Sequence, residues 1–325
     1  MPKMPEYVEK YMTNLAVKRR SEKTLYQYNQ DLLTFCRYLY AVKYNLCLDE
    51  EILKEQDVSR LTNEDINSVR AEDIYNYIVY LTKQRGNSAV TICRKVSSVK
   101  GFYKFLIVIE HCIDKNPAEN IELPKKKKRL PKYLTLEESI SLLEAVAKDT
   151  DSRYRERNYC VITIFLNCGI RLSELTGISI SDLDPELRSM RVIGKGNKER
   201  IVYLNDACAN AIKDYIAVRG KDGEIKDKNA LFISREHRRM SNIGVQKMVE
   251  KYFKKAGLEY KHYSVHKLRH TAATLMYQTG KVDVRVLKDI LGHEQLNTTQ
   301  IYTHISDKGM EDAVKNNPLA NKGRK

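Results

Sequence analysis

The sequence predicts a mainly α-helical fold with a small antiparallel β-sheet, an α+β class, divided between two domains. Apolar residues recur at three- and four-residue intervals through most of the chain, which is typical of amphipathic helices. Two short apolar segments flank a glycine-containing turn around Lys195, which predicts one β-hairpin. A run of basic residues, Lys125–Arg129, follows Pro124 and separates the two regions. The 325 residues are enough for each domain to bury its own core.

The first third of the chain is predicted to be helical. An apolar stripe from Leu25 to Leu39 indicates one helix, and similar stripes indicate a second over 71–84 and a third over 88–109. Between the first two lies an irregular, acidic insert at 45–70, to which no element is assigned. We therefore expect a helical N-terminal domain over residues 1–117.

Basic residues lie among the apolar residues of the third predicted helix. Arg94, Lys95 and Lys100 could contact a phosphate backbone, or they could belong to an ordinary solvated helix face. For any one of them, the sequence favours neither interpretation over the other. All three are candidate DNA-binding residues.

Residues 118–131 are predicted to form a basic interdomain linker, because a charge run beside prolines cannot form a core. Short basic runs are usually only solvated. Here the run lies between two helical regions, where it could follow a duplex backbone. Lys126 and Lys128 are therefore candidate DNA contacts.

The second domain, 132–325, begins with a capping-box pattern at Thr135–Glu138 and continues into a strongly apolar helix over 159–167, which Gly169 would end. A polar tail closes the domain. The other predicted elements are strands at 190–193 and 201–204, a third strand at 231–234, and helices at 241–256, 265–279, 283–291 and 298–303.

Charge is distributed unevenly along the chain. There are 57 Lys and Arg residues against 42 Asp and Glu, a net charge of +15. Residues 1–123 hold 18 basic and 17 acidic residues, so the remaining 39 basic and 25 acidic residues give 124–325 a net charge of +14. Such asymmetry fits a polyanionic partner, since phosphate binding releases counterions. A generically basic protein is the alternative.

Cysteine usage and hydropathy indicate a cytoplasmic protein without a membrane segment. The seven cysteines form no CxxC pair and no metal-ligand spacing, which favours free thiols in a reducing compartment. No apolar run approaches the ~18–20 residues that a spanning helix needs. The N-terminus lacks the apolar segment of a secretory signal. No metal site and no cofactor are expected.

Two short motifs could form an anion site. His266, Arg269 and His270 fall on one face of a predicted helix, near its start, where unpaired amides favour an anion. Arg171 begins another helix three residues before Glu174, which could hold the guanidinium for bidentate contact with phosphate. Taken alone, each motif is more often structural.

The hairpin and the C-terminal region supply further candidates. Lys195 lies at the hairpin tip and could contact phosphate or act as a general acid, while Lys198 and Arg200 are expected to contact the DNA backbone. His293 follows a predicted helix, and Tyr302 comes nine residues later. A phenol has a pKa of about 10, so Tyr302 would need nearby cations or a base to become a nucleophile.

Taken in order, these motifs closely resemble the tyrosine recombinase (bacteriophage integrase) family, particularly its Xer-like members. The resemblance covers residues 130–305 and rests on the lead-in LPKYLT, then GIRLSEL, GKGNKERIVYL, HKLRHTAAT and LGHEQLNTTQIYTH. The N-terminal helices resemble, less specifically, the family's core-binding (SAM-like) domain. The resemblance implies a tyrosine-recombinase catalytic domain after the linker.

The resemblance also implies a role for each catalytic position. Arg171 and Arg269 would clamp the scissile phosphate, with His293 donating a hydrogen bond and His266 acting as base or phosphate ligand. Lys195 would protonate the departing 5′ oxygen, and Tyr302 would form a 3′-phosphotyrosyl link. Glu174 and His270 would hold the helices and arginines in place.

The resemblance further implies a homo- or hetero-tetramer on two duplexes, with strand exchange through a Holliday junction. No carboxylate cluster for Mg²⁺ and no GxxxxGK[ST] motif is visible, so neither metal nor ATP is expected to take part. Either chromosome or plasmid resolution or mobile-element integration and excision fits. The alternatives are a non-catalytic, sequence-specific DNA-binding protein and a type IB topoisomerase. The insert at 45–70 departs from the compact Xer pattern.

Overall fold

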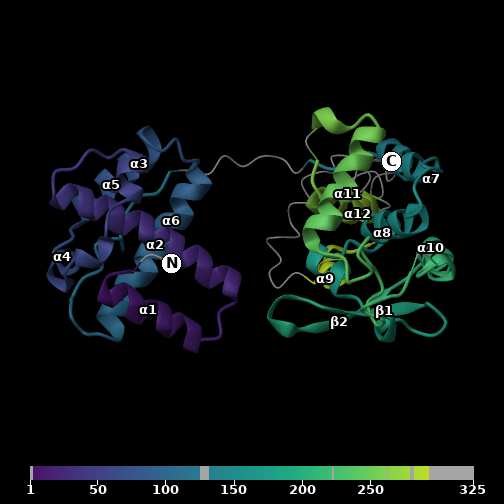
Figure 1. The fold of residues 1–325 in the computed structure, drawn as a ribbon, viewed down its shortest axis with the longest axis horizontal. Helices are drawn as coiled ribbons and strands as arrows, with labels where there is room; N and C mark the ends of the chain where they lie inside the picture. The colour runs from purple at the N-terminus through teal and green to yellow at the C-terminus, as the bar shows by residue number, and fades with distance from the viewer. Residues whose placement is uncertain (1–2, 125–131, 222, 262, 279–281, 293–325) are drawn as a thin grey trace, which may run out of the picture. The chain divides into compact units, whose positions relative to one another are not determined.

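The computed structural model describes residues 3–124, 132–221, 223–261, 263–278 and 282–292. The described chain is mostly helical with one small antiparallel sheet, which confirms the predicted fold class (Figure 1). Contacts divide it into two compact units, Met1–Lys128 and Arg129–Lys325. None of the described helices is both long and apolar enough to cross a membrane.

The N-terminal unit is a helical bundle around an aromatic core. Phe35, Phe102, Tyr77 and Tyr103 are almost fully buried, and the ring of Phe35 lies edge-on to Tyr77 with 5.1 Å between centroids. The long helices start at serine caps, because Ser21 and Ser88 each accept a backbone hydrogen bond in the first turn. Its helices are α1 (Glu6–Val17), α2 (Glu22–Lys43), α3 (Glu50–Lys54), η1 (Val58–Arg60), α4 (Asn63–Asn67), α5 (Ala71–Lys83) and α6 (Ala89–Val108).

The insert at 45–70 is structured, although no element had been assigned to it. It forms α3, η1 and α4, started by side-chain caps at Asp49, Asp57 and Thr62. Each short helix buries one apolar residue, and the Tyr103 hydroxyl donates to the Ile66 carbonyl oxygen at 3.0 Å. Helices this short cannot show an apolar period in the sequence, which is why the pattern did not reveal them.

The beginning of the predicted linker packs against α6. Ala118 is only 2% exposed, and the carbonyl oxygen of Glu119 accepts a hydrogen bond from Lys100 Nζ at 2.8 Å. The Cys93 thiol also lies 3.6 Å from the carbonyl oxygen of Pro124. Residues 118–124 therefore belong structurally to the N-terminal unit, and the basic run that follows lies outside the described residues.

The second unit is built around helix α8 (Arg155–Cys168), which packs against α7 (Leu136–Ala147), α10 (Asp206–Val218) and α12 (Val265–Gln278) (Figure 1). Most residues of α8 are buried, as its uninterrupted apolar sequence predicts. Gly169 ends α8 in the left-handed conformation, with φ of 60°. The remaining elements are α9 (Leu172–Gly177), η2 (Ile180–Asp182), η3 (Lys195–Asn197), α11 (Asn242–Lys255), η4 (Glu259–Lys261) and α13 (Val284–Leu291).

The sheet consists of β1 (Ser189–Ile193) and β2 (Glu199–Tyr203), paired antiparallel from Ser189 opposite Tyr203 to Ile193 opposite Glu199. The predicted third strand at 231–234 is wrong, since Ile233 alone among these residues forms a β-bridge, an isolated one with Arg239. Leu231 and Phe232 are buried because they pack into the core, so their apolar character reflects packing rather than strand pairing. The helix predicted over 298–303 lies outside the described residues.

Candidate active site

One buried carboxylate, that of Glu174, organises the candidate site. Glu174 lies in the first turn of α9, and none of its side chain is exposed. Its Oε2 accepts the backbone N–H of Arg171 at 2.7 Å, which fixes the start of the helix. Its Oε1 accepts a hydrogen bond from Arg171 Nη1 at 2.8 Å, as the spacing of the two residues suggested.

A second arginine reaches the same carboxylate from the sheet. Arg200 of β2 donates from Nη1 to Oε1 at 2.6 Å and from Nη2 to Oε2 at 3.0 Å, so the pair is bidentate. Gly194 allows the hairpin to approach, since a Cβ there would lie 3.2 Å from Glu174 Oε1. The hairpin is thereby held against α9.

A third arginine comes from α12. Arg269 is 3% exposed, and its Nη1 lies 3.9 Å from Glu174 Oε2. Its Nη2 donates to the carbonyl oxygen of Leu291 at 2.5 Å, while Arg171 Nη2 donates to that of Gly292 at 2.9 Å. Two arginines that are 98 positions apart in the sequence therefore meet at the C-terminal end of α13.

The cluster remains cationic because one carboxylate faces three guanidinium groups. Burial alone would raise the pKa of Glu174, but hydrogen bonds from Arg200 and Arg171 outweigh it and lower that pKa to about 2. Glu174 is therefore ionised at any physiological pH. The remaining positive charge suits an anion such as a phosphodiester.

His266 lies in the first turn of α12, one turn before Arg269. Its ring meets that of His270 edge-on, with 4.6 Å between centroids. Although part of the ring is exposed to solvent, desolvation of the rest lowers the pKa of His266, and the positive charges of Arg269, Lys267 and Arg171 lower it further. The imidazole is thus predominantly neutral at pH 7 and able to accept a proton.

The other predicted catalytic residues are described only in part. The backbone of Lys195 opens η3 at the tip of the β1–β2 hairpin, where Gly196 has φ of 76°. His293 and Tyr302 lie outside the described residues, although His293 directly follows Gly292 in the sequence. Three of the six positions, Arg171, His266 and Arg269, therefore have described side chains.

The predicted DNA contacts of α6 have protein partners. Arg94, whose side chain is 40% exposed, is ion-paired with Asp31, and the mostly buried Lys95 donates to Thr34 Oγ1 at 2.9 Å. Lys100 pairs with Glu119 at 3.0 Å. Their contact with DNA stays a prediction, and for Lys95 burial favours an internal role instead.

Of the four remaining predicted DNA contacts, the structure describes the side chains of two, Lys198 and Arg200. Lys198 is exposed on the hairpin, so DNA contact stays a prediction for it. Arg200 faces Glu174 with its side chain 17% exposed, which favours a role inside the site. Lys126 and Lys128 lie outside the described residues.

Sequence reasoning missed the place of Arg200 in the cluster. The signal was strand alternation: Arg200 and Val202 fall on the same face of β2, and Val202 is buried. The carbonyl acceptors of Leu291 and Gly292 could not have been found, because any residue type supplies a carbonyl. Among the described residues no group of His, Cys, Asp and Glu side chains is arranged to hold a metal ion.

Sequence comparison identifies the class of protein to which this fold and cluster belong. Residues 132–308 match the Phage integrase family, and residues 51–108 match the Phage integrase N-terminal SAM-like domain. The chain is 45% identical over 319 residues to Tyrosine recombinase XerC of Caldanaerobacter subterraneus, covering 98% of this chain and 88% of the relative. It is 32% identical over 295 residues to Tyrosine recombinase XerD of Halalkalibacterium halodurans, covering 90% of each.

Solved structures agree with this assignment. A XerH site-specific recombinase bound to difH substrate in a pre-cleavage complex superposes with a TM-score of 0.67 at 25% identity, over 90% of this chain and 79% of that one. This chain belongs to the phage integrase family. It is a tyrosine site-specific recombinase of the Xer-like group.

Proposed function

We propose that this chain cleaves and rejoins duplex DNA through a 3′-phosphotyrosyl intermediate formed by Tyr302. The observation that carries the proposal is the convergence of Arg171 and Arg269 on consecutive carbonyls at the end of α13. Those carbonyls immediately precede His293 in the sequence. Two guanidinium groups in fixed positions, that of Arg269 buried and that of Arg171 partly exposed, can neutralise the non-bridging oxygens of a phosphodiester as charge develops on them.

The chemistry is an in-line displacement at phosphorus. The phenolic oxygen of Tyr302 forms a bond to phosphorus as the bond from phosphorus to the 5′ oxygen breaks. The neutral His266 takes the phenolic proton or binds the phosphate, Lys195 protonates the departing 5′ oxygen, and His293 donates a hydrogen bond to the phosphate. Attack by a 5′ hydroxyl on the phosphotyrosine reverses these transfers and rejoins the strand.

The XerH structure is described as a complex with its difH substrate, and we propose duplex DNA as the partner here too. Four protomers on two recombination sites, identical or of two kinds, would exchange strands one pair at a time through a Holliday junction. The reaction would take place in the cytoplasm, with chromosome or plasmid resolution and mobile-element integration as the two biological settings. Both settings use the same chemistry.

A suicide-substrate assay tests the proposal. Nicked duplexes that carry the recombination site should trap a covalent protein–DNA adduct with the native chain, and Tyr302→Phe should form none while still binding the duplex. Tyr260→Phe, at a tyrosine that is 67% exposed, is the control and should form the adduct normally. An adduct that persists in Tyr302→Phe would show that another residue is the nucleophile.

The same assay tests whether metal ions take part. The arginines supply the positive charge in this scheme, so adduct formation should be unchanged by EDTA. Loss of the adduct on chelation, with recovery on adding Mg²⁺, would show metal-dependent chemistry instead. DNA binding without any adduct in the native chain would favour the non-catalytic DNA-binding alternative.

A further inference from the structure

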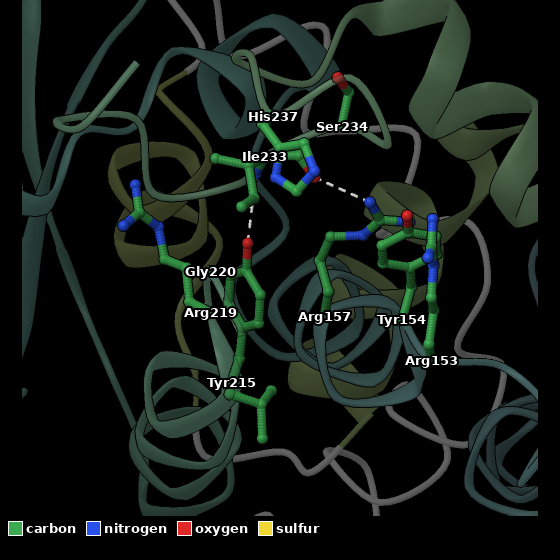
Figure 2. A pocket seen from close by; sticks show the side chains of 10 residues that line it. Arg153, Tyr154, Arg157, Tyr215, Arg219, Gly220, Ile233, Ser234 and His237 are labelled. Carbon is green, nitrogen blue, oxygen red and sulfur yellow. Dashed lines mark hydrogen bonds between the residues drawn. The ribbon is translucent and has the colours of Figure 1, made fainter. Parts of the chain in front are cut away.

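A small cavity in the catalytic unit lies at the N-terminal end of α8, the opposite end of the helix from Gly169 and Arg171. Figure 2 shows its lining side chains, which come from the start of α8, the end of α10 and the loop that holds Ser234 and His237. The cavity has a volume of about 20 Å³, enough for one water-sized occupant. Three arginines line it, Arg153, Arg157 and Arg219, and no acidic residue is among the lining residues that the structure describes.

Arg157 is a buried cation whose hydrogen bonds all go to neutral groups. It is 7% exposed, and its Nη1 donates to the carbonyl oxygen of Ile233 at 2.7 Å (Figure 2). Its Nε and Nη2 donate to Asn158 Oδ1 at 3.1 and 2.9 Å. Within the described part of the chain, no carboxylate lies within ion-pair distance of Arg157. A buried charge without a counterion is unfavourable.

The two neighbouring arginines do not supply a counterion either. Arg219 donates to backbone carbonyls, including that of Ala230 at 2.6 Å, and it too has no carboxylate partner among the described residues. Arg153 and Arg157 both lie over the ring of Tyr154, at 4.8 and 4.3 Å from its centroid. Three arginines thus line one cavity, and none of the described lining residues carries a balancing negative charge.

Two described acidic residues that adjoin lining residues in the sequence, Glu156 and Glu236, are engaged elsewhere. Glu156 is hydrogen-bonded to Arg155 at 2.7 Å, and Glu236 is paired with Arg235 at 3.5 Å. The charge of Glu236 acts to raise the pKa of Arg157, but it is the smallest of the effects on that pKa. Glu236 is exposed and does not line the cavity. Solvent therefore screens most of its charge.

Two buried polar atoms of the lining residues also have no hydrogen-bond partner among the described residues. They are the hydroxyl of Tyr154 and Nδ1 of His237. A phenolic O–H donates, and an imidazole Nδ1 that carries the proton donates as well. An acceptor placed in the cavity would satisfy such donors, and leaving them without a partner is costly.

We propose that this cavity binds one small inorganic anion of the halide class, chloride in physiological salt, as the counterion of Arg157. The volume suits a monatomic ion, the charge of Arg157 favours an anion over water, and the unpartnered Tyr154 hydroxyl is a donor that calls for an acceptor. The bound ion would hold together the start of α8, the end of α10 and the loop at 233–237. It would thereby stabilise the helix whose other end leads into Arg171.

Thermal unfolding of the full-length chain tests the proposal. At equal ionic strength, melting in sodium chloride should occur about 2–4 °C above melting in sodium gluconate, whose anion is too large for the cavity. Tyr154→Phe should reduce this difference and Arg157→Met should abolish it. Arg188→Met is the matched control, since Arg188 is 80% exposed, lies in the same unit and does not line the cavity.

A crystal grown in sodium bromide gives an independent measurement, because bromide scatters anomalously. The native chain should show an anomalous peak in the cavity, and Arg157→Met should show none. An equal melting difference in the native chain and in both cavity variants would overturn the proposal. So would an ordered water without anomalous signal, or a bromide peak with no effect on melting, which would indicate an adventitious ion only. If Arg157→Met does not fold, Tyr154→Phe decides.

Discussion

Arg200 and Glu174 form a two-point ion pair, with 2.6 Å from Nη1 to Oε1 and 3.0 Å from Nη2 to Oε2. The pair joins the β1–β2 hairpin to the first turn of α9. Lys195 lies on that hairpin, and Arg171 directly precedes that helix. The distance between the backbones of two candidate catalytic residues is therefore set partly by one buried pair, which makes Arg200 a positioning residue.

We expect Arg200→Lys to slow DNA cleavage by about 10- to 100-fold while DNA binding is retained. Lysine keeps the charge but cannot make two parallel hydrogen bonds, so the hairpin loses its fixed position, and small misplacements of catalytic groups reduce rates on this scale. The measurement is single-turnover adduct formation, with duplex affinity determined in parallel. The loss should appear in the cleavage rate rather than in the affinity.

Arg191→Lys is the matched control for this experiment. Arg191 lies on the same hairpin and donates to Asp182 at 2.7 and 3.0 Å, but its side chain is 46% exposed and outside the cluster. It should cleave at nearly the native rate. Equal losses in the two variants, or a loss of affinity alone in Arg200→Lys, would show that Arg200 does not position the site.

Glu174→Gln should destabilise the catalytic unit by about 3–5 kcal/mol at pH 7, because it leaves buried guanidinium groups without their counterion. The free energy of unfolding is measured by chemical denaturation. Unfolding is followed by far-UV circular dichroism, because the chain contains no Trp. Glu144→Gln is a suitable control, because Glu144 forms an exposed pair with Lys148 and should contribute under 1 kcal/mol. A change as small as that of the control would contradict the central role of Glu174.

The stability contributed by Glu174 should depend on pH in a defined direction. Its pKa in the folded chain, about 2, lies below the ordinary value of 4.5, so folding favours the ionised form. The contribution is fully present above pH 4.5 and is lost as the pH falls towards 2. The difference in unfolding free energy between the native chain and Glu174→Gln should therefore shrink through that window. A difference that grows on acidification would contradict this assignment.

Most of the fold can be predicted from the sequence, because the long helices have a clear apolar periodicity and recognisable capping residues. The Thr135 capping box, the apolar α8 and the stop at Gly169 all appear in the structure as predicted. The sequence does not predict helices α1 and α10, and it assigns no element to the insert at 45–70. Short helices stabilised by one cap and one buried side chain carry too little pattern to be recognised.

The sequence predicts which residues belong to the candidate site, but it does not predict the contacts between them. The sequence placed Arg171 beside Glu174 and His266 on the face of Arg269, because helical spacing alone determines both relationships. It could not show that Arg200 pairs with the carboxylate of Glu174, since that contact joins a residue of β2 to a residue of α9 that lies 26 positions away in the sequence. For the same reason it could not show which carbonyls receive the two arginines.

Gly292→Ala should impair cleavage beyond its effect on stability. Gly292 has φ of 62°, and an added Cβ would lie 3.2 Å from Cδ, Nε and Cζ of Arg200, so the guanidinium would have to move. We expect a loss of stability of about 1–2 kcal/mol from the backbone together with a further fall in adduct formation. Thermal unfolding and single-turnover cleavage separate the two effects.

Gly257→Ala provides the comparison, because Gly257 has φ of 70° in the same unit but nothing lies within 4 Å of an added Cβ. It should lose similar stability without a fall in cleavage at a temperature where both variants are folded. If the two variants cleave equally well, contact between Gly292 and Arg200 has no bearing on the site.

The ionisation of His266 should determine how cleavage responds to acid. Desolvation and the neighbouring cations lower the pKa of His266 below its ordinary value of 6.5, so the imidazole stays neutral at pH 7 and becomes protonated only at lower pH. Adduct formation by the native chain should therefore be flat near pH 7 and fall on a single acid limb below pH 6.5. His266→Gln should be slower at pH 7 by about 100-fold, within the range for general bases, and should lack that limb. His270→Gln, which alters the adjacent ring, should keep the limb. If His266→Gln retained the same acid limb, another group would be the base and His266 would act only as a phosphate ligand.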